Sequence, residues 1–179
     1  SSDKKFDNFT VVWIGSPSTS IYLNEIKDVI NDLAEKHHIQ FLTIGANPND
    51  IKDLNCNKLD WSTDSEYQIL SKCHVGIMPL KNTLWEMGKC GFKILQYMSV
   101  KIPVIASPYG INSQIIKDGE NGFTAVNKDE WIKKILILKN DNLVYKKLQI
   151  NGYDTVYKNF NFETLKLKLS KIINEINIK

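Results

Sequence analysis

The sequence contains no arginine, and all 23 basic residues among its 179 are lysines. Asparagine and isoleucine are abundant, so a biased base composition of the genome explains this absence better than a functional demand does. The absence still restricts the chemistry available. An anion must be held here by lysine ammonium groups, hydroxyls and backbone N–H groups, because no guanidinium fork is present.

Cysteine and net charge are also scarce. The cysteines Cys56, Cys73 and Cys90 are odd in number and form no CxxC pair, which argues against a disulfide framework or a zinc site and favours an intracellular protein. We interpret them as small buried hydrophobic residues, with Cys90 accessible in a loop. The net charge of +3 is too small to predict nucleic-acid binding.

Long apolar segments are missing as well. No run approaches the roughly 20 residues that span a bilayer, and residues 1–5 lack the apolar core of a signal peptide. These absences predict a cytoplasmic protein. The chain does not begin with methionine, which indicates a processed or excised product. Its length and its 42% hydrophobic residues predict one globular domain with a full core.

Apolar strands alternate with amphipathic helices along the sequence. The strands are expected at residues 9–14, 39–44, 56–61, 74–78, 102–106 and 123–126. The helices are expected at residues 22–33, at 67–70 after a cap at Asp64 or Ser65, and at 92–100, 111–117, 128–139, 142–157 and 162–176. This alternation predicts an α/β fold, a Rossmann-like, doubly wound parallel sheet with helices on both faces.

Ligands of such sheets bind beyond the carboxyl ends of the strands, near helix N-termini. The first such end reads Gly15-Ser16-Pro17-Ser18-Thr19-Ser20. Glycine permits a sharp turn there, and a hydroxyl can cap the next helix while its free N–H groups face an anion. A plain helix cap is the alternative. The stretch matches neither GxGxxG nor GxxxxGK[ST], so it supports neither a dinucleotide site nor a P-loop.

The second such end precedes the helix expected at residues 92–100. Gly88 and Gly91 allow backbone N–H groups to approach a phosphate closely. Lys89 and Lys93 are four residues apart around the same turn, and Gln96 can exchange hydrogen bonds with a ligand hydroxyl. The alternative is an ordinary helix start with solvated lysines.

Residues 88–112 and 115–123 resemble the C-terminal, nucleotide-sugar-binding half of the GT-B glycosyltransferases of family 4, also called glycosyltransferase group 1. The shared features are the Gly-rich helix start, the segment Met-Ser-Val-Lys-Ile-Pro-Val-Ile and the turn Asp-Gly-Glu-Asn-Gly. The resemblance covers nearly the whole chain. It implies that residues 1–179 form the donor-binding domain, and that the N-terminal acceptor domain lies outside this chain.

The resemblance also implies a role for individual residues. The donor diphosphate is expected to bind Gly15, Ser16, Ser18, Thr19, Lys89, Gly91, Phe92 and Lys93. Gln96 falls on a glutamate that holds the ribose in the family, and Trp61 lies in the nucleobase region, although it can equally be a packing residue. The family's other glutamate, which approaches the donor sugar, falls on Gly88. Glu86 is therefore the candidate catalytic residue. His74 falls on a family aspartate, and we interpret it as a core histidine.

The implied reaction transfers a hexose-type unit from a UDP- or GDP-linked sugar to an acceptor hydroxyl, with retention, in glycan or cell-envelope polysaccharide synthesis. We expect no metal and no cofactor, because the sequence has no Asp-x-Asp triad and no metal-ligand cluster. The expected partners are the nucleotide-sugar donor and the N-terminal domain, which can attach the enzyme to the inner face of the membrane. The isolated chain should bind donor without turnover. A nucleotide-sugar epimerase half and a degenerate, non-catalytic binding module are the alternatives.

Overall fold

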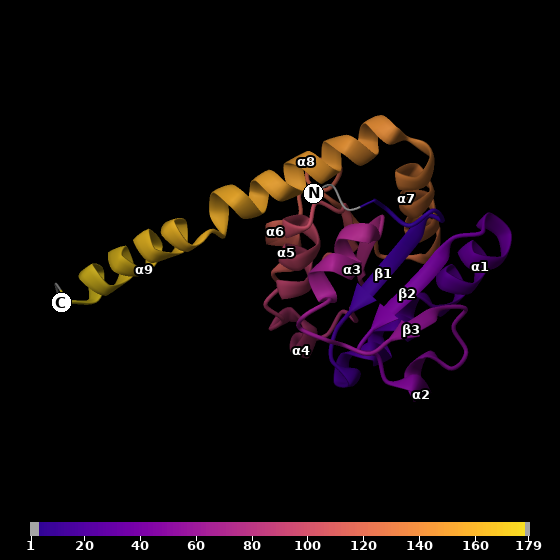
Figure 1. The fold of residues 1–179 in the computed structure, drawn as a ribbon. Helices are drawn as coiled ribbons and strands as arrows, with labels where there is room; N and C mark the ends of the chain where they lie inside the picture. Colours follow the sequence, from indigo (N-terminus) through magenta and orange to yellow (C-terminus); the bar gives the residue numbers. More distant parts are fainter. Residues whose placement is uncertain (1–3, 178–179) are drawn as a thin grey trace.

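A computed structural model describes residues 4–177, and in it six strands form one sheet in the order β3-β2-β1-β4-β5-β6 (Figure 1). Every pairing between neighbouring strands is parallel. The strands are β1 (Thr10–Ile14), β2 (Gln40–Ile44), β3 (Asn57–Leu59), β4 (Val75–Met78), β5 (Val104–Ala106) and β6 (Phe123–Thr124). The predicted doubly wound α/β fold is confirmed.

The helices differ from expectation in three places. They are η1 (Pro17–Ile26), α1 (Lys27–His37), α2 (Pro48–Ile51), α3 (Glu66–Lys72), α4 (Leu84–Met87), α5 (Phe92–Ser99), α6 (Asn112–Ile115), α7 (Lys128–Asn140), α8 (Asn142–Asn159) and α9 (Phe162–Asn177). The single helix expected at residues 22–33 is wrong, because its first part is the 3₁₀ helix η1. The short helices α2 and α4 were not expected, since one turn shows no periodicity.

Side chains of β1 alternate between two hydrophobic cores, one on each face of the sheet. Val11 and Trp13 pack in the core that contains the apolar residues of α1 and α7. Val12 and Ile14 pack in the core that contains those of α3 and α5. This alternation follows from the two-residue repeat of a strand, and it leaves the ends of the strands free to carry a site.

Tyr97 fixes α5 against the sheet. Its side chain is fully buried, and its hydroxyl accepts a hydrogen bond from the Ile14 N–H at 3.0 Å and donates one to the Ile77 carbonyl at 3.2 Å. Gly76 of β4 provides the space, because a Cβ at this position would lie 2.2 Å from the Tyr97 ring. Helix α5 is thereby held beside the end of β1.

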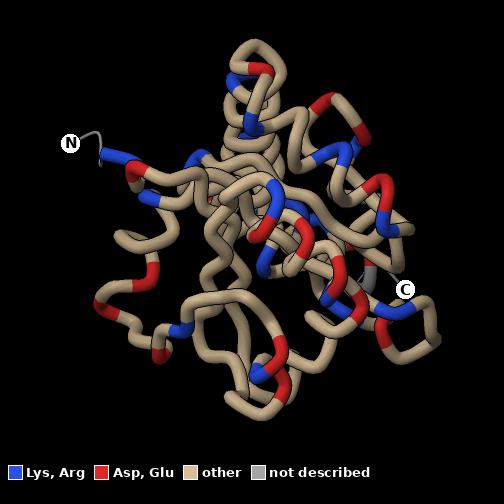
Figure 2. The backbone as a smooth tube through the Cα atoms, turned by 90° about the vertical axis from the view of Figure 1, so that its right-hand side faces the viewer, with Lys and Arg blue, Asp and Glu red and all other residues tan. Residues whose placement is uncertain are grey.

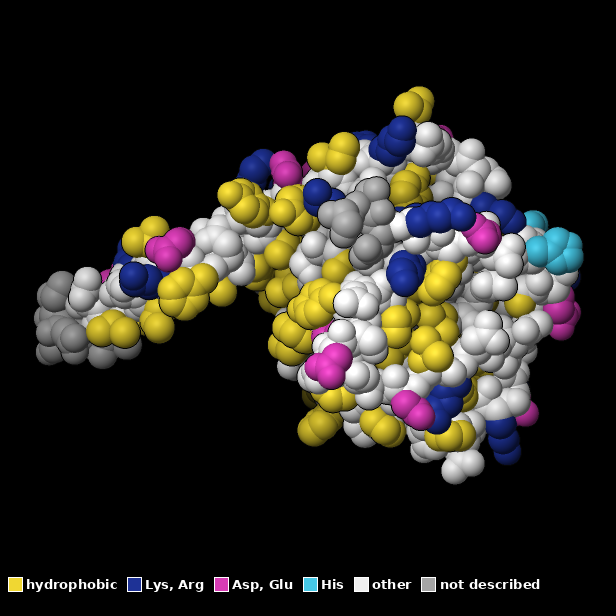
Figure 3. Space-filling view, in the orientation of Figure 1, with side chains coloured by type: hydrophobic (Ala, Val, Ile, Leu, Met, Phe, Trp, Pro, Cys, Tyr) yellow, Lys and Arg dark blue, Asp and Glu magenta, His cyan; other side chains and the backbone are white. Residues whose placement is uncertain are grey.

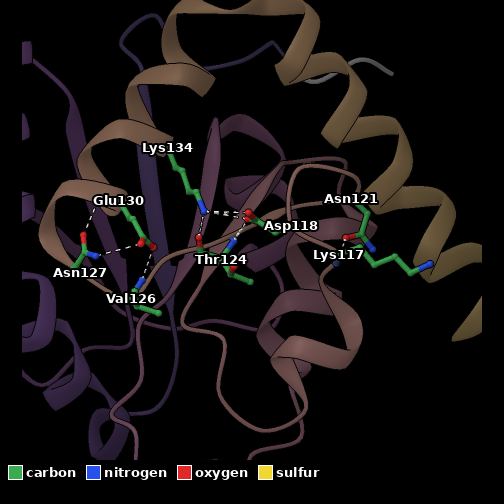
Figure 4. A network of polar contacts seen from close by, with 8 residues as sticks. All are labelled: Lys117, Asp118, Asn121, Thr124, Val126, Asn127, Glu130 and Lys134. Atoms are coloured by element: carbon green, nitrogen blue, oxygen red, sulfur yellow. Dashed lines mark hydrogen bonds and ion pairs between the residues drawn. The ribbon is translucent and has the colours of Figure 1, made fainter.

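The Asp-Gly-Glu-Asn-Gly turn is held by a polar network beside β6 (Figure 4). Asp118 accepts a hydrogen bond from the Thr124 N–H at 2.7 Å and forms an ion pair with Lys134 at 3.1 Å. The side chain of Asn121 accepts a hydrogen bond from the Lys117 N–H at 2.8 Å. These bonds give the turn a structural role, and it takes no part in the cavity described below.

Helix α9 extends away from the rest of the molecule (Figure 1). Figure 3 shows hydrophobic side chains along this arm. The exposed ones are Phe162, Leu165, Leu167, Leu169, Ile172 and Ile173. Within residues 4–177, no helix combines the length and hydropathy needed to cross a membrane. Lysines and acidic residues are interspersed along the backbone in the view of Figure 2.

His74 is held as a neutral side chain beside β1. Its Nδ1 atom accepts a hydrogen bond from the Thr10 N–H at 3.0 Å, and its ring lies 4.9 Å from the ring of Phe9. Burial, with a smaller effect of the Lys5 charge, lowers the pKa of His74 from 6.5 to about 4. His74 therefore has a structural role, although it is only partly buried and not the core residue that we expected.

The lowered pKa of His74 predicts a loss of stability in mild acid. Between pH 6.5 and about 4 the unfolded chain binds a proton at this position that the folded chain does not, so the free energy of unfolding falls as the pH falls. Urea unfolding at pH 7 and pH 4.5 measures this loss. In His74→Asn, whose side-chain oxygen can accept the Thr10 N–H, the loss should be smaller. An equal loss in both proteins would assign it to other groups.

Candidate functional site

A cavity of about 730 Å³ lies at the carboxyl ends of β1, β2 and β4, next to the N-terminus of α5. Small-molecule sites typically measure roughly 300–1,000 Å³, and this position is the usual one for ligands of parallel sheets. Eight of the predicted site residues line the cavity: Gly15, Ser16, Trp61, Lys89, Gly91, Phe92, Lys93 and Gln96. Ser18, Thr19 and Glu86 do not line it.

Gly15 leaves room for a lysine across the end of β1. Its N–H donates to the Ile44 carbonyl at 3.0 Å, and a Cβ at Gly15 would lie 2.6 Å from Cε of Lys93. A side chain here would therefore displace the lysine. Glycine at this position is explained by the approach of Lys93 and of the Trp13 ring, two atoms of which would lie 2.8 Å from that Cβ, and its φ is not in the left-handed region.

The hydroxyls after Gly15 are arranged differently from the prediction. We expected Ser18, Thr19 or Ser20 to cap the helix, but η1 begins at Pro17 with Ser16 in the N-cap position, and no side chain caps it. Proline at the first helical position fixes this earlier start. The hydroxyls of Ser18 and Thr19 lie 3.0 and 3.4 Å from the Ser16 hydroxyl instead.

The start of α5 presents hydrogen-bond donors to the cavity. Gly91 is its N-cap residue with a φ of 69°, which glycine adopts at little cost, and a Cβ there would lie 2.6 Å from Cδ1 of Ile115. Phe92 and Lys93 follow as the first helical residues. Because the first N–H groups of a helix have no partner within it, this end suits an anion.

Two lysines beside this helix start have aromatic rings as neighbours. The ammonium group of Lys93 lies 5.5 Å from the centre of the Trp13 ring, and that of Lys89 lies 5.4 Å from the centre of the Tyr22 ring. Within residues 4–177, neither forms an ion pair with a carboxylate. Burial, followed by the charge of Lys89, lowers the pKa of Lys93. Such uncompensated positive charge favours binding of an anion.

Acidic residues line another part of the cavity. Asp60 forms an ion pair with Lys58 at 3.1 Å. Glu66 is 8% exposed, accepts a hydrogen bond from the Gln96 side chain at 3.1 Å, and accepts another from the Trp61 indole N–H. Trp61 is 53% exposed, so it is not a core residue. Glu66 was not among the predicted site residues, and its only signal in the sequence is that a glutamate stands in the first turn of α3.

Glu86 is buried outside the cavity wall. Its carboxylate accepts hydrogen bonds from the hydroxyls of Thr83 and of Tyr22, the latter at 2.7 Å. These bonds, that of Thr83 first, lower the pKa of Glu86. They join α4 to η1, a structural role. The catalytic role of Glu86 stays a prediction, and it would require the carboxylate to leave both partners.

The possible metal ligands of the described segment are dispersed. Across residues 4–177, no three His, Cys, Asp or Glu side chains gather in an arrangement that could hold an ion. Cys90 is exposed beside Lys89, whereas Cys73 is buried and Cys56 is partly buried.

Known proteins share this fold. The sequence profile of the family described as "Glycosyl transferases group 1" matches residues 8–141, which is most of the chain. A search of the curated proteins by sequence finds no match.

Three solved structures show how far the similarity extends. The C-terminal domain of the glycosyl transferase group 1 protein LpcC from Francisella tularensis is 18% identical, with a TM-score of 0.65 over 90% of this chain and 97% of that one. HepE from Anabaena in complex with UDP is 17% identical, with a TM-score of 0.79 over 94% of this chain and 49% of that one.

The third structure is the pneumococcal O-GlcNAc transferase GtfA in complex with UDP and GlcNAc. It is 16% identical, with a TM-score of 0.72 over 100% of this chain and 38% of that one. The chain thus spans half or less of HepE and GtfA, and nearly all of the LpcC domain. It belongs to the glycosyl transferases group 1 family.

Proposed function

We propose that this chain is the donor-binding half of a retaining, metal-independent glycosyltransferase and that it binds a UDP-linked sugar in the cavity beside α5. The observation that carries this proposal is the pair of lysines, Lys89 and Lys93, which lack a carboxylate partner within residues 4–177 and flank the start of α5 in a cavity of about 730 Å³. The structurally similar HepE and GtfA are both described in complex with UDP.

The proposed chemistry follows from the charge of the leaving group. When the bond between the sugar and the diphosphate breaks, negative charge grows on the diphosphate. Two ammonium groups and the N–H groups of Phe92 and Lys93 are suited to stabilise that charge. Lysine and backbone donors would then perform the task for which other proteins use arginine or a divalent cation.

A second domain is the other part of the proposal. The chain spans 49% of HepE and 38% of GtfA, and its α9 carries apolar side chains that nothing in the described structure covers. We propose that an N-terminal domain supplies the acceptor site and that this chain alone does not transfer sugar. A hexose-type donor, a role in glycan or envelope synthesis, and a location at the inner face of the membrane stay predictions from the sequence.

Calorimetric titration with UDP, GDP and ADP, each with and without EDTA, tests the proposal. We expect UDP to bind, more tightly than the other two nucleotides, with an affinity that EDTA does not change. We also expect no product when this chain is incubated with UDP-sugar and acceptor mixtures. Failure of all three nucleotides to bind would favour a degenerate module. Epimerised donor, formed by the longer protein without acceptor, would favour an epimerase.

A further inference from the structure

Glu66 is a buried carboxylate in the wall of the cavity. One carboxylate oxygen accepts a hydrogen bond from the side chain of Gln96 at 3.1 Å, and the other accepts one from the indole N–H of Trp61. Within residues 4–177, no lysine lies within ion-pair distance of it. In this part of the chain its side-chain oxygens have two neutral hydrogen-bond donors, the amide of Gln96 and the indole of Trp61.

Burial of a carboxylate in this position costs free energy unless further hydrogen-bond donors contact it. Moving a charge out of water costs several kcal/mol even after relaxation, and hydrogen bonds must compensate for it. A carboxylate offers about four acceptor positions, and Trp61 and Gln96 occupy two of them. The remaining positions call for donors without negative charge. Hydroxyl groups of a ligand in the cavity meet that requirement.

The hydrogen bond between Glu66 of α3 and Gln96 of α5 defines which part of a ligand Glu66 can reach. Gln96 lies three residues after Lys93 on α5, and side chains three apart lie on the same face of a helix, about one turn from each other. The cavity thus has a positive part at Lys93 and a hydroxyl-accepting part at Glu66 and Gln96. A ligand that fits both carries adjacent hydroxyls a short distance from its phosphates, as a ribonucleotide does.

We propose that Glu66, positioned by Trp61 and Gln96, binds the vicinal 2′ and 3′ hydroxyls of the nucleotide ribose and makes the site selective for ribonucleotides over deoxyribonucleotides. This inference rests on the proposed function and adds to it a specificity residue from α3. The carboxylate and the amide act as one unit, in which the carboxylate accepts from the hydroxyls and the amide holds it in place. This arrangement predicts that Glu66 and Gln96 can exchange their carboxylate and amide groups, but that two carboxylates at these positions would repel each other.

The test compares UDP with 2′-deoxy-UDP in the wild type and in three variants: Glu66→Gln, Gln96→Glu and the double variant that carries both. The wild type should prefer UDP by roughly ten-fold or more, the usual effect of a hydrogen bond to a charged group. Glu66→Gln should lose most of this preference. Gln96→Glu brings two carboxylates together, so UDP should bind less tightly at pH 8 than at pH 5. The double variant contains one carboxylate again, and it should recover the preference and lose that pH dependence.

Glu130→Gln is the matched control, because Glu130 is a first-turn glutamate of α7 that accepts the Val126 N–H outside the cavity. It should keep the wild-type preference. Equal affinity of the wild type for UDP and 2′-deoxy-UDP would overturn the inference and leave the proposed function intact. So would a double variant that folds without recovering the preference. If the variants change the affinity for UDP-glucose but not for UDP, Glu66 contacts the transferred sugar and not the ribose, and the inference is overturned. Failure of the wild type to bind UDP would overturn both proposals.

Discussion

Replacing Lys93 with alanine is expected to weaken UDP binding by roughly 1.5–3 kcal/mol, which corresponds to a loss of about ten- to hundred-fold in affinity. The ammonium group lies over Trp13 at the start of α5 without a carboxylate partner among residues 4–177, so a diphosphate would be its counter-ion. Because its pKa is lowered, wild-type affinity should also begin to fall at a lower alkaline pH than an ordinary lysine would allow. Calorimetric titration measures both effects.

Two further variants separate charge from packing. Lys93→Met keeps much of the apolar stem beside Trp13 and Gly15, so a loss equal to that of Lys93→Ala would assign the effect to the charge. Lys101 is the matched control, since its ammonium group lies 4.5 Å from the centre of the Tyr153 ring and outside the cavity. Lys101→Ala should leave the affinity unchanged. Unaltered affinity in both Lys93 variants would remove this residue from the site.

The substitution Gly76→Ala is expected to lower the free energy of unfolding by about 2–4 kcal/mol. Its Cβ would lie 2.2–2.5 Å from three atoms of the Tyr97 ring. The ring must then shift, which adds the cost of overpacking to the loss of the bond between its hydroxyl and the Ile14 N–H. Urea unfolding at neutral pH measures the change.

Gly88→Ala provides the comparison for this prediction. A Cβ at Gly88 would meet only the Trp85 carbonyl oxygen, at the ordinary contact distance of 3.5 Å, and its φ is −81°. It should change stability by no more than about 0.5 kcal/mol, as surface substitutions usually do. Equal stability of Gly76→Ala and the wild type would show that Tyr97 is not fixed as described.

The strands β1, β2, β4 and β5 could be predicted from the sequence because each is a short, mostly apolar run that ends at glycine, proline or a polar residue. The 3₁₀ helix η1 could not be predicted in the same way. Its buried residues Ser20, Leu23 and Ile26 repeat every three residues, the period of a 3₁₀ helix, but Tyr22 between them imitates the three-and-four spacing of an α-helix.

The site was predicted in part, for a physical reason. Gly91, Lys89 and Lys93 are close in sequence, so one helix start places them together. Glu66 could not be found this way, because its burial depends on Gln96, which is 30 residues away. A first-turn glutamate usually signals only an interaction with the helix dipole. Likewise, nothing near Glu86 in sequence reveals its bond to Tyr22, 64 residues earlier.

Titration of the labelled chain with UDP, followed through its backbone amide resonances, locates the nucleotide on the protein. We predict saturable shifts at Gly15, Gly91 and Lys93, which line the cavity, and none at Gly119 in the turn beside β6. The same shifts should be strongly reduced in Lys93→Met. The absence of shifts at saturating UDP, or shifts confined to residues outside the cavity, would contradict a donor site at the start of α5.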